Sequence, residues 1–234
     1  MRTIGLIGGM SWHSTASYYR IINETVAERL GGHASAQISL QSLDFAEVRR
    51  CQVAGDWAAA GELLGRAAAA SVAGGAEVVA ICTNLMHKVA PQVEAAVDVP
   101  LLHIADAVAG VAGPRGWERL GILGARWVME ESFYADRLAR HGITAVTPGA
   151  ADRELVDRVI FEELTQGSVR DESRAAYVEV IERLAEQGAQ AVVLACTEIG
   201  LLVGPDDSPL PLIDSADAHA RALAEVVLSA PVPA

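Results

Sequence analysis

The chain has 234 residues and a formal net charge of −12, and 51% of its residues are hydrophobic but only 5% aromatic. That length is enough for one large domain or for two of roughly 100 residues each. The acidic balance and the lack of a basic run argue against nucleic acid and anionic membranes as partners, because both attract a cationic surface. The sequence shows no signal-peptide pattern and no apolar run of membrane-spanning length, so we expect no membrane partner.

Short apolar runs alternate with helical stretches along the chain, which is the pattern of an α/β protein with parallel sheets. Strands are expected at Thr3–Ile7, Ala36–Leu43, Glu77–Ile81, Leu101–His103, Arg119–Leu123, Ala145–Thr147, Ala191–Ala195 and Leu212–Ile213. Helices are expected at Ser14–Leu30, Trp57–Ala73, Met129–His141, Ala151–Gln166, Ser173–Gln187 and Ala216–Leu228.

Three segments of the first half recur in the second half in the same order. The pairs are RTIGLIGG (2–9) with ERLGILGA (118–125), GAEVVAICTN (75–84) with GAQAVVLACT (188–197), and VPLLHIADA (99–107) with LPLIDSADA (210–218). Their nearly constant offset predicts two pseudo-symmetric, doubly wound parallel-sheet domains with the active site in the cleft between them. The first domain is expected to comprise residues 1–103 and 214–234, and the second domain residues 104–213.

The second pair of repeats ends in cysteines and small polar residues. Aligning the two copies on their first glycines sets Cys82 against Ala195 and Thr83 against Cys196. Ligands of open α/β sheets bind beyond the carboxyl ends of the strands, so Thr83 and Cys196 are predicted to flank the cleft. Successive strand residues point to opposite faces, so the Cys82 thiol is predicted to face the sheet packing unless the strand end bulges.

Cys196 is the strongest candidate for a reactive group. A cysteine at a strand end beside a helix start is favoured as a thiolate, which predicts a lowered pKa. Thr197 and Asn84 can bond a substrate carboxylate or amine, and Glu198 can accept from an ammonium group. The alternative is an inert core cysteine. Three cysteines cannot all pair internally, which favours a reducing cytoplasmic location with at least one free thiol.

The remaining candidate residues are His87 and Lys88, and the sequence lacks the common motifs of metal and nucleotide sites. His87 could orient a loop or act as an acid, and a surface histidine is the other interpretation. The sequence has no GxGxxG motif, P-loop, HExxH, CxxC or GxSxG, so no metal or nucleotide site is expected. Lys88 is the only lysine that could form a Schiff base with pyridoxal phosphate. Cofactor-free chemistry with a thiolate base is what remains.

Several motifs together resemble the aspartate/glutamate racemase family of the larger aspartate/glutamate/hydantoin racemase superfamily. They are IGLIGGMSWHST, CTNLMHK, IFEEL, ACTEIGLL and PLIDSADAHA, and they extend over essentially the whole chain. The resemblance implies a racemase without pyridoxal phosphate or any other cofactor. It further implies two pseudo-symmetric α/β domains, a homodimer and a small amino-acid substrate. In this family two cysteines on opposite sides of the substrate Cα exchange the α-proton.

The family's catalytic pair carries over only in part. The second cysteine corresponds to Cys196. Anchoring the first motif on Asn84 and His87 puts Thr83 in place of the first cysteine, in agreement with the internal repeat. Leu85 replaces a motif threonine, which removes a donor to the substrate carboxylate.

The substrate side chain is less closely defined by the resemblance. Thr165 falls where related aspartate racemases have a lysine that reads the distal carboxylate, and Arg49 lies near the expected family arginine. Ligands of open α/β sheets bind in the loops that follow the strands, so substrate binding is expected at Met10, Ser11, Asn84, Leu85, Thr197 and Glu198.

Three functions are therefore compared. The first is an amino-acid racemase in which Cys196 serves one face of the substrate and Thr83, or a water that it holds, serves the other. The second is a one-thiol decarboxylase or cis–trans isomerase of a small carboxylic acid. The third is an amino-acid-binding protein without catalysis. Deuterium exchange at Cα separates the three.

Overall fold

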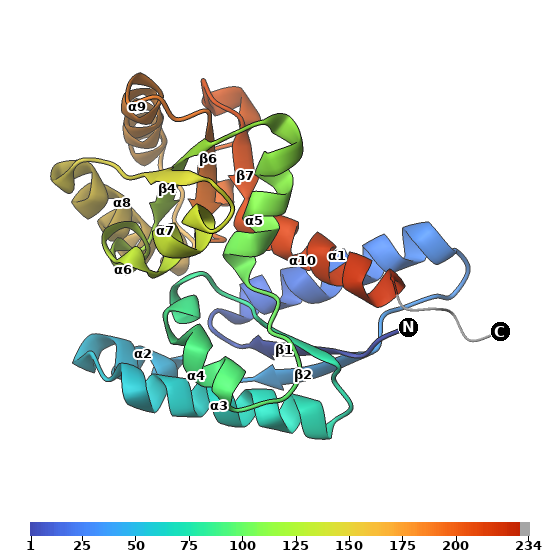
Figure 1. Cartoon of the computed structure of the whole chain (residues 1–234). Coiled ribbons are helices and arrows are strands. Elements are labelled where there is room, and N and C mark those ends of the chain that lie inside the picture. Colours follow the sequence, from blue (N-terminus) through green and yellow to red (C-terminus); the bar gives the residue numbers. More distant parts are fainter. Residues whose placement is uncertain (230–234) are drawn as a thin grey trace. The chain divides into compact units, whose positions relative to one another are not determined.

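The computed structural model describes residues 1–229, and the chain divides into two compact units. The first unit comprises Met1–Ile104 together with the chain from His219 onward, and the second comprises Ala105–Ala218. The sequence repeats place the two junctions at 103/104 and 213/214. Figure 1 shows that each unit is built from a parallel sheet and helices packed on it.

The first unit has a three-stranded parallel sheet in the order β2-β1-β3. The strands are β1 (Ile4–Gly8), β2 (Ile38–Ser42) and β3 (Val78–Ile81). Its helices are α1 (Trp12–Leu30), α2 (Phe45–Ala54), α3 (Trp57–Ala73), the 3-10 turn η1 (Leu85–Val89) and α4 (Ala90–Ala95). The chain returns to this unit in α10 (Ser215–Leu228), which lies beside α1 (Figure 1).

The second unit has a four-stranded parallel sheet in the order β5-β4-β6-β7. The strands are β4 (Arg119–Gly124), β5 (Thr144–Val146), β6 (Ala191–Ala195) and β7 (Leu212–Asp214). Its longer helices are α5 (Ile104–Ala112), α7 (Ser132–Ala139), α8 (Ala150–Glu162) and α9 (Asp171–Glu186). The short ones are α6 (Arg126–Glu130), η2 (Gly113–Arg115), η3 (Leu164–Gln166), η4 (Ile199–Leu201) and η5 (Pro205–Asp207).

The two sheets repeat the same strand order and the same register. Val79 of β3 pairs with Gly5 of β1 and forms an isolated parallel bridge with Leu101 on its other side. The aligned residue Val192 of β6 pairs in the same way with Gly121 of β4 and with Leu212 of β7. This confirms the α/β class with two parallel-sheet domains that the repeats predict.

Apolar side chains fill both faces of the central strands. Every residue of β1, β3 and β6 is buried, as expected for parallel strands covered by helices on both sides. The turn after β1 is equally crowded. Gly9 has a φ of +89°, and a Cβ added there would lie 2.1 Å from the Leu43 carbonyl oxygen. Only glycine fits that turn without displacing the backbone that follows β2.

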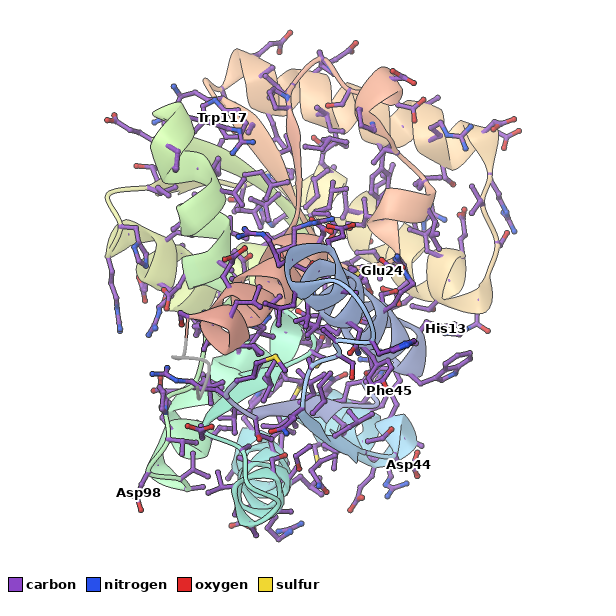
Figure 2. The ribbon with its side chains drawn as sticks, turned by 90° about the vertical axis from the view of Figure 1, so that its right-hand side faces the viewer. His13, Glu24, Asp44, Phe45, Asp98 and Trp117 are labelled. Carbon is purple, nitrogen blue, oxygen red and sulfur yellow. The ribbon has the colours of Figure 1, made fainter. Side chains whose placement is uncertain are left out.

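Several expected elements differ from those observed. Residues 101–103 form a single bridge and not a strand, and Met129–His141 is divided between α6 and α7. The helices α2 and α5 were not expected. Asp44 starts α2 because its side chain accepts a hydrogen bond from the Ala46 N–H, and Figure 2 shows Asp44 and Phe45 at this end of the helix.

Helix length and hydropathy show whether any of these helices could cross a membrane. Among the helices of residues 1–229, none combines the length and the apolar character that crossing a bilayer requires.

Candidate functional site

The carboxyl ends of β3 and β6 present different side chains at equivalent positions. Cys82 and its counterpart Ala195 are both buried, and the Cys82 thiol is completely inaccessible. Thr83 and Cys196, one residue further along, are both partly exposed. Each strand end therefore offers one side chain to a ligand, a hydroxyl in the first unit and a thiol in the second.

The Cys196 thiol is bonded to a carboxylate. Its Sγ–H donates to Oε2 of Glu198 at 3.1 Å, and the Thr197 hydroxyl donates to the same oxygen at 2.7 Å. Burial raises the pKa of the Cys196 thiol well above its usual range, and the negative charge and hydrogen bond of Glu198 raise it further. The lowered thiol pKa expected from the sequence is therefore wrong, first because the sulfur is buried and second because the acidic side chain two residues later turns back onto it.

Two further groups of the second unit influence this thiol. The Asp157 carboxylate also raises the pKa of Cys196, and its Oδ1 accepts the backbone N–H of Arg126 at 2.7 Å. Tyr177 is buried and donates its hydroxyl to the carbonyl oxygen of Val156 at 2.9 Å. Burial, followed by the charge of Cys196, raises the pKa of Tyr177 above its ordinary value. Neither residue could be predicted from the sequence, because no recognised motif includes Asp157 or Tyr177.

The peptide groups around Thr83 are held by two buried side chains. The Ser14 hydroxyl donates to the Cys82 carbonyl at 3.1 Å, and Nδ1 of His87 donates to the Thr83 carbonyl at 2.8 Å. Burial raises the pKa of the Cys82 thiol far above its usual range, so this thiol is a poor acid or base. Of the three interpretations of His87, orientation of a loop fits the observed contacts, and an exposed surface position is wrong because the side chain is buried.

The loop after β1 contains the next two candidates. Met10 is buried, and Ser11 caps α1 by accepting the Ser14 N–H at 3.4 Å. Thr15 ties this loop together, because its hydroxyl accepts the Gly9 N–H at 2.8 Å and donates to the Ser11 carbonyl at 3.0 Å. A network of this kind holds the loop in one shape.

The remaining candidates differ in exposure. Asn84 and Leu85 are both buried beside Thr83. Arg49 lies on α2 and donates to the Gln52 side chain at 3.2 Å. Thr165 is exposed on η3, and its hydroxyl donates to the Phe161 carbonyl at 3.0 Å. A contact between Thr165 and substrate would therefore compete with a bond inside its own helix end.

Lys88, the single lysine of the chain, is partly buried. Its ammonium lies 4.1 Å from the centre of the Trp57 ring, a cation–π contact between η1 and α3. In the part of the chain that the structure describes, no cluster of three or more His, Cys, Asp or Glu side chains is arranged to hold a metal ion.

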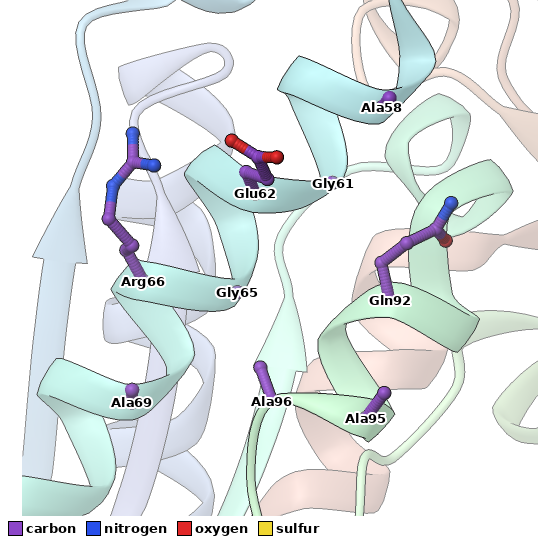
Figure 3. Close-up of a pocket in the computed structure, with 9 residues that line it drawn as sticks. All are labelled: Ala58, Gly61, Glu62, Gly65, Arg66, Ala69, Gln92, Ala95 and Ala96. Carbon is purple, nitrogen blue, oxygen red and sulfur yellow. The ribbon is translucent and has the colours of Figure 1, made fainter.

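A surface groove of about 640 Å³ lies away from these strand ends, between α3 and α4 (Figure 3). Gly61 and Gly65 let the two helices approach each other closely at the groove. A Cβ on Gly61 would come within 2.9 Å of the Gln92 side chain, and one on Gly65 within 3.2 Å of Ala96. None of the candidate site residues lines the groove, so we assign no function to it.

Three histidines of the first unit form a buried cluster. The rings of His87 and His103 have centroids 4.3 Å apart, and those of His87 and His219 are 5.8 Å apart. Burial lowers the pKa of His87 well below its usual value of about 6.5, and the two neighbouring histidines lower it further. His87 is therefore neutral in the folded protein at physiological pH.

The neutral state of His87 predicts a loss of stability in mild acid. Below about pH 6.5 the His87 side chain binds a proton in the unfolded chain but stays unprotonated in the folded chain. The free energy of unfolding is therefore expected to be constant above that pH and to fall below it, by up to about 1.4 kcal/mol per pH unit from this one group. Urea unfolding at pH 7.5, 6.5 and 5.5 measures the decline. A His87→Asn variant with the same decline would contradict the assignment.

Comparison with known proteins identifies a racemase family over nearly the whole chain. The sequence profile of the Asp/Glu/Hydantoin racemase family matches residues 7–223. A proposed Asp/Glu racemase from Yersinia pestis is 49% identical, with a TM-score of 0.93, and the match covers 98% of this chain and 100% of that one. An aspartate racemase homologue from Pyrococcus horikoshii is 31% identical, with a TM-score of 0.84 and the same coverage of both chains.

A more distant structure shares the fold. The aspartate racemase of Picrophilus torridus is 19% identical and has a TM-score of 0.76, with 97% of this chain and 94% of that chain covered. The profile match and the two closer structures are sufficient to classify the protein. The chain belongs to the Asp/Glu/Hydantoin racemase family and is thus an enzyme of the isomerase class.

Proposed function

We propose that this protein is a cofactor-independent amino-acid racemase that exchanges the Cα proton of a small acidic or polar amino acid. The observation that carries the proposal is the hydrogen bond between the Cys196 thiol and the Glu198 carboxylate at the end of β6. An acid/base group beside a proton acceptor is what abstraction of a weakly acidic proton needs. Membership in a racemase family supports this reaction over others.

The thiol and the carboxylate can act as one unit. Transfer of the thiol proton to Glu198 leaves the net charge of the pair unchanged. Loss of that proton to solvent would instead leave two negative charges about 3.1 Å apart, a repulsion of order 5 kcal/mol at an effective dielectric constant of about 20. Glu198 is therefore the proton acceptor that converts Cys196 into a base. Because the thiol pKa is raised, the thiolate formed in this way is a stronger base.

Thr83 transfers the proton on the second face of the substrate. A threonine hydroxyl is not a base near neutral pH, but it can relay a proton to or from a water molecule. Racemisation then proceeds in two unequal halves. Cys196 removes or returns the proton directly on one face, and Thr83, or a water that it holds, does so on the other. The homodimer and the acidic character of the substrate remain predictions from the family resemblance.

Incubation of the protein with single L- and D-amino acids in D₂O tests this proposal. Racemisation is expected to replace the α-proton by deuterium, which adds one mass unit, and to convert one enantiomer into the other. Proton NMR and chiral chromatography measure the two changes, with aspartate and glutamate tested first. Loss of carbon dioxide from a dicarboxylic acid, or isomerisation of an unsaturated acid, would show the one-thiol alternative. Thermal stabilisation by an amino acid without any exchange would show a binding protein.

A further inference from the structure

Thr83 lies between two peptide groups that are each held by a buried side chain. The carbonyl of the preceding peptide accepts from Ser14 on α1, and the carbonyl of the following peptide accepts from His87 on η1. The orientations of these two peptide planes determine φ and ψ of Thr83, and therefore the direction of its Cα–Cβ bond. The two contacts thus fix the direction in which the Thr83 side chain leaves the backbone.

The hydrogen bonds of His87 define its tautomer. Its Nε2 accepts the backbone N–H of Ile104 at 3.2 Å, so the ring proton is on Nδ1, where it is donated to the Thr83 carbonyl. The backbone N–H of His87 also donates to the Asn84 carbonyl at 3.1 Å. A neutral His87 therefore connects the end of β3 to the segment Leu102–Ile104.

The segment Leu102–Ile104 is itself held by side chains of α10 and α1. Nε2 of His219 donates to the Leu102 carbonyl at 2.8 Å, and the Tyr18 hydroxyl donates to Nδ1 of the same histidine at 2.8 Å. The Leu102 N–H donates to the Val79 carbonyl at 2.9 Å. Tyr18 and His219 are fully buried, so no water competes for these bonds. The support of Thr83 thus runs continuously from His87 to α10 and α1.

The corresponding position in the second unit has a different support. The Cys196 carbonyl accepts a backbone N–H, that of Ile199, at 3.1 Å. Near this end of β6, the Ser215 hydroxyl donates to the Leu194 carbonyl at 2.8 Å. Side-chain support of both peptides around the reactive residue is thus shown for Thr83 and not for Cys196, within the residues described.

We propose that Ser14 and His87 are positioning residues that aim the Thr83 hydroxyl at the face of the substrate opposite Cys196. This inference rests on the proposed racemase activity. It predicts that loss of either contact impairs delivery of the proton by Thr83 and leaves proton removal by Cys196 largely intact. A purely structural role would impair both steps equally.

The partition between exchange and inversion in D₂O separates these two roles. The equilibrium constant between enantiomers is one, so kcat/KM for racemisation must fall equally in both directions and cannot reveal an uneven defect. Exchange without inversion can, because Cys196 alone can remove a proton and return deuterium to the same face once the Cys196–Glu198 pair has exchanged with solvent. The measurement is the deuterium content of recovered substrate of unchanged configuration, relative to that of the inverted product.

His87→Leu removes the donor and keeps an apolar side chain in the buried site. We expect racemisation to fall about ten- to hundredfold, as for a misplaced catalytic group. The ratio of exchange to inversion should rise by a similar factor for the enantiomer that Cys196 deprotonates. His87→Asn places a donor near the original Nδ1 position and is expected to restore most of the lost racemisation. Ser14→Ala, which removes one hydroxyl, should raise the ratio in the same direction and carries the test where His87→Leu does not fold.

Ser215→Ala is the matched control, because it removes a buried serine bond to a strand carbonyl in the second unit. We expect no rise of the ratio in this variant. Equal loss of exchange and inversion in the His87 and Ser14 variants, or an equal rise with Ser215→Ala, would overturn the positioning role. A wild-type protein that exchanges no amino acid would instead refute the racemase proposal itself.

Discussion

Replacement of Cys196 by alanine is expected to abolish exchange of the substrate α-proton with solvent. The thiol is the only acid/base group that we assign to its face of the substrate, and Thr83 cannot replace it as a base. General acid/base groups typically contribute two to four orders of magnitude, so we expect a rate loss of at least about 10³-fold for both enantiomers. The measurement is loss of the α-proton NMR signal in D₂O.

Cys82→Ala is the matched control for this experiment. Cys82 lies on the equivalent strand end of the first unit, but its thiol is completely buried and its pKa is raised by burial. Exchange should therefore persist in a folded Cys82→Ala protein. Full exchange in Cys196→Ala, or loss of exchange only in Cys82→Ala, would contradict the assignment of Cys196 as the base.

Replacement of Glu198 by glutamine is expected to change two rates in opposite directions. Racemisation should fall by about 10²- to 10⁴-fold, because the thiol loses the group that accepts its proton. Alkylation of Cys196 by iodoacetamide at neutral pH should become faster. The reason is that removal of the Glu198 charge removes one cause of the raised thiol pKa, and the thiolate is the species that is alkylated.

The opposite signs make this prediction specific to a proton-accepting role. If Glu198 only bound the substrate ammonium group, KM would rise and kcat would change less. Asp157→Asn is the control, since Asp157 also raises the thiol pKa but makes no hydrogen bond to the sulfur. It should speed alkylation less than Glu198→Gln and leave racemisation largely intact. Slower alkylation in Glu198→Gln would refute the proposed pairing.

Features that repeat along the chain were predictable from the sequence. The aligned copies correctly predicted two parallel sheets, and they separated Cys82 from the pair formed by Thr83 and Cys196. The reason is physical. Buried parallel strands are short, continuous apolar runs, so their ends can be located and compared residue by residue.

Contacts that depend on the turns after the strands could not be predicted in this way. The predicted direction of the Cys196 pKa shift was wrong because strand periodicity shows neither how deeply the sulfur is buried nor where the Glu198 side chain turns. The bonds of Ser14 to Cys82 and of Tyr18 to His219 join residues 68 and 201 positions apart, and no local pattern relates such residues. Helix α5 was missed because Asp106 is the single polar residue in a run of Ile, Ala, Val and Gly, which is too few to mark a helical period.

The bond between Tyr18 and His219 also constrains the order in which the chain can fold during synthesis. The second unit is one continuous stretch, Ala105–Ala218, and all of it has been translated before His219 is added. The first unit is begun earlier but needs α10 to complete the contacts of Tyr18 and Leu102. Along the chain the unit that is started first is therefore completed last, and the support of Thr83 that runs through Leu102 is incomplete until α10 has packed onto α1.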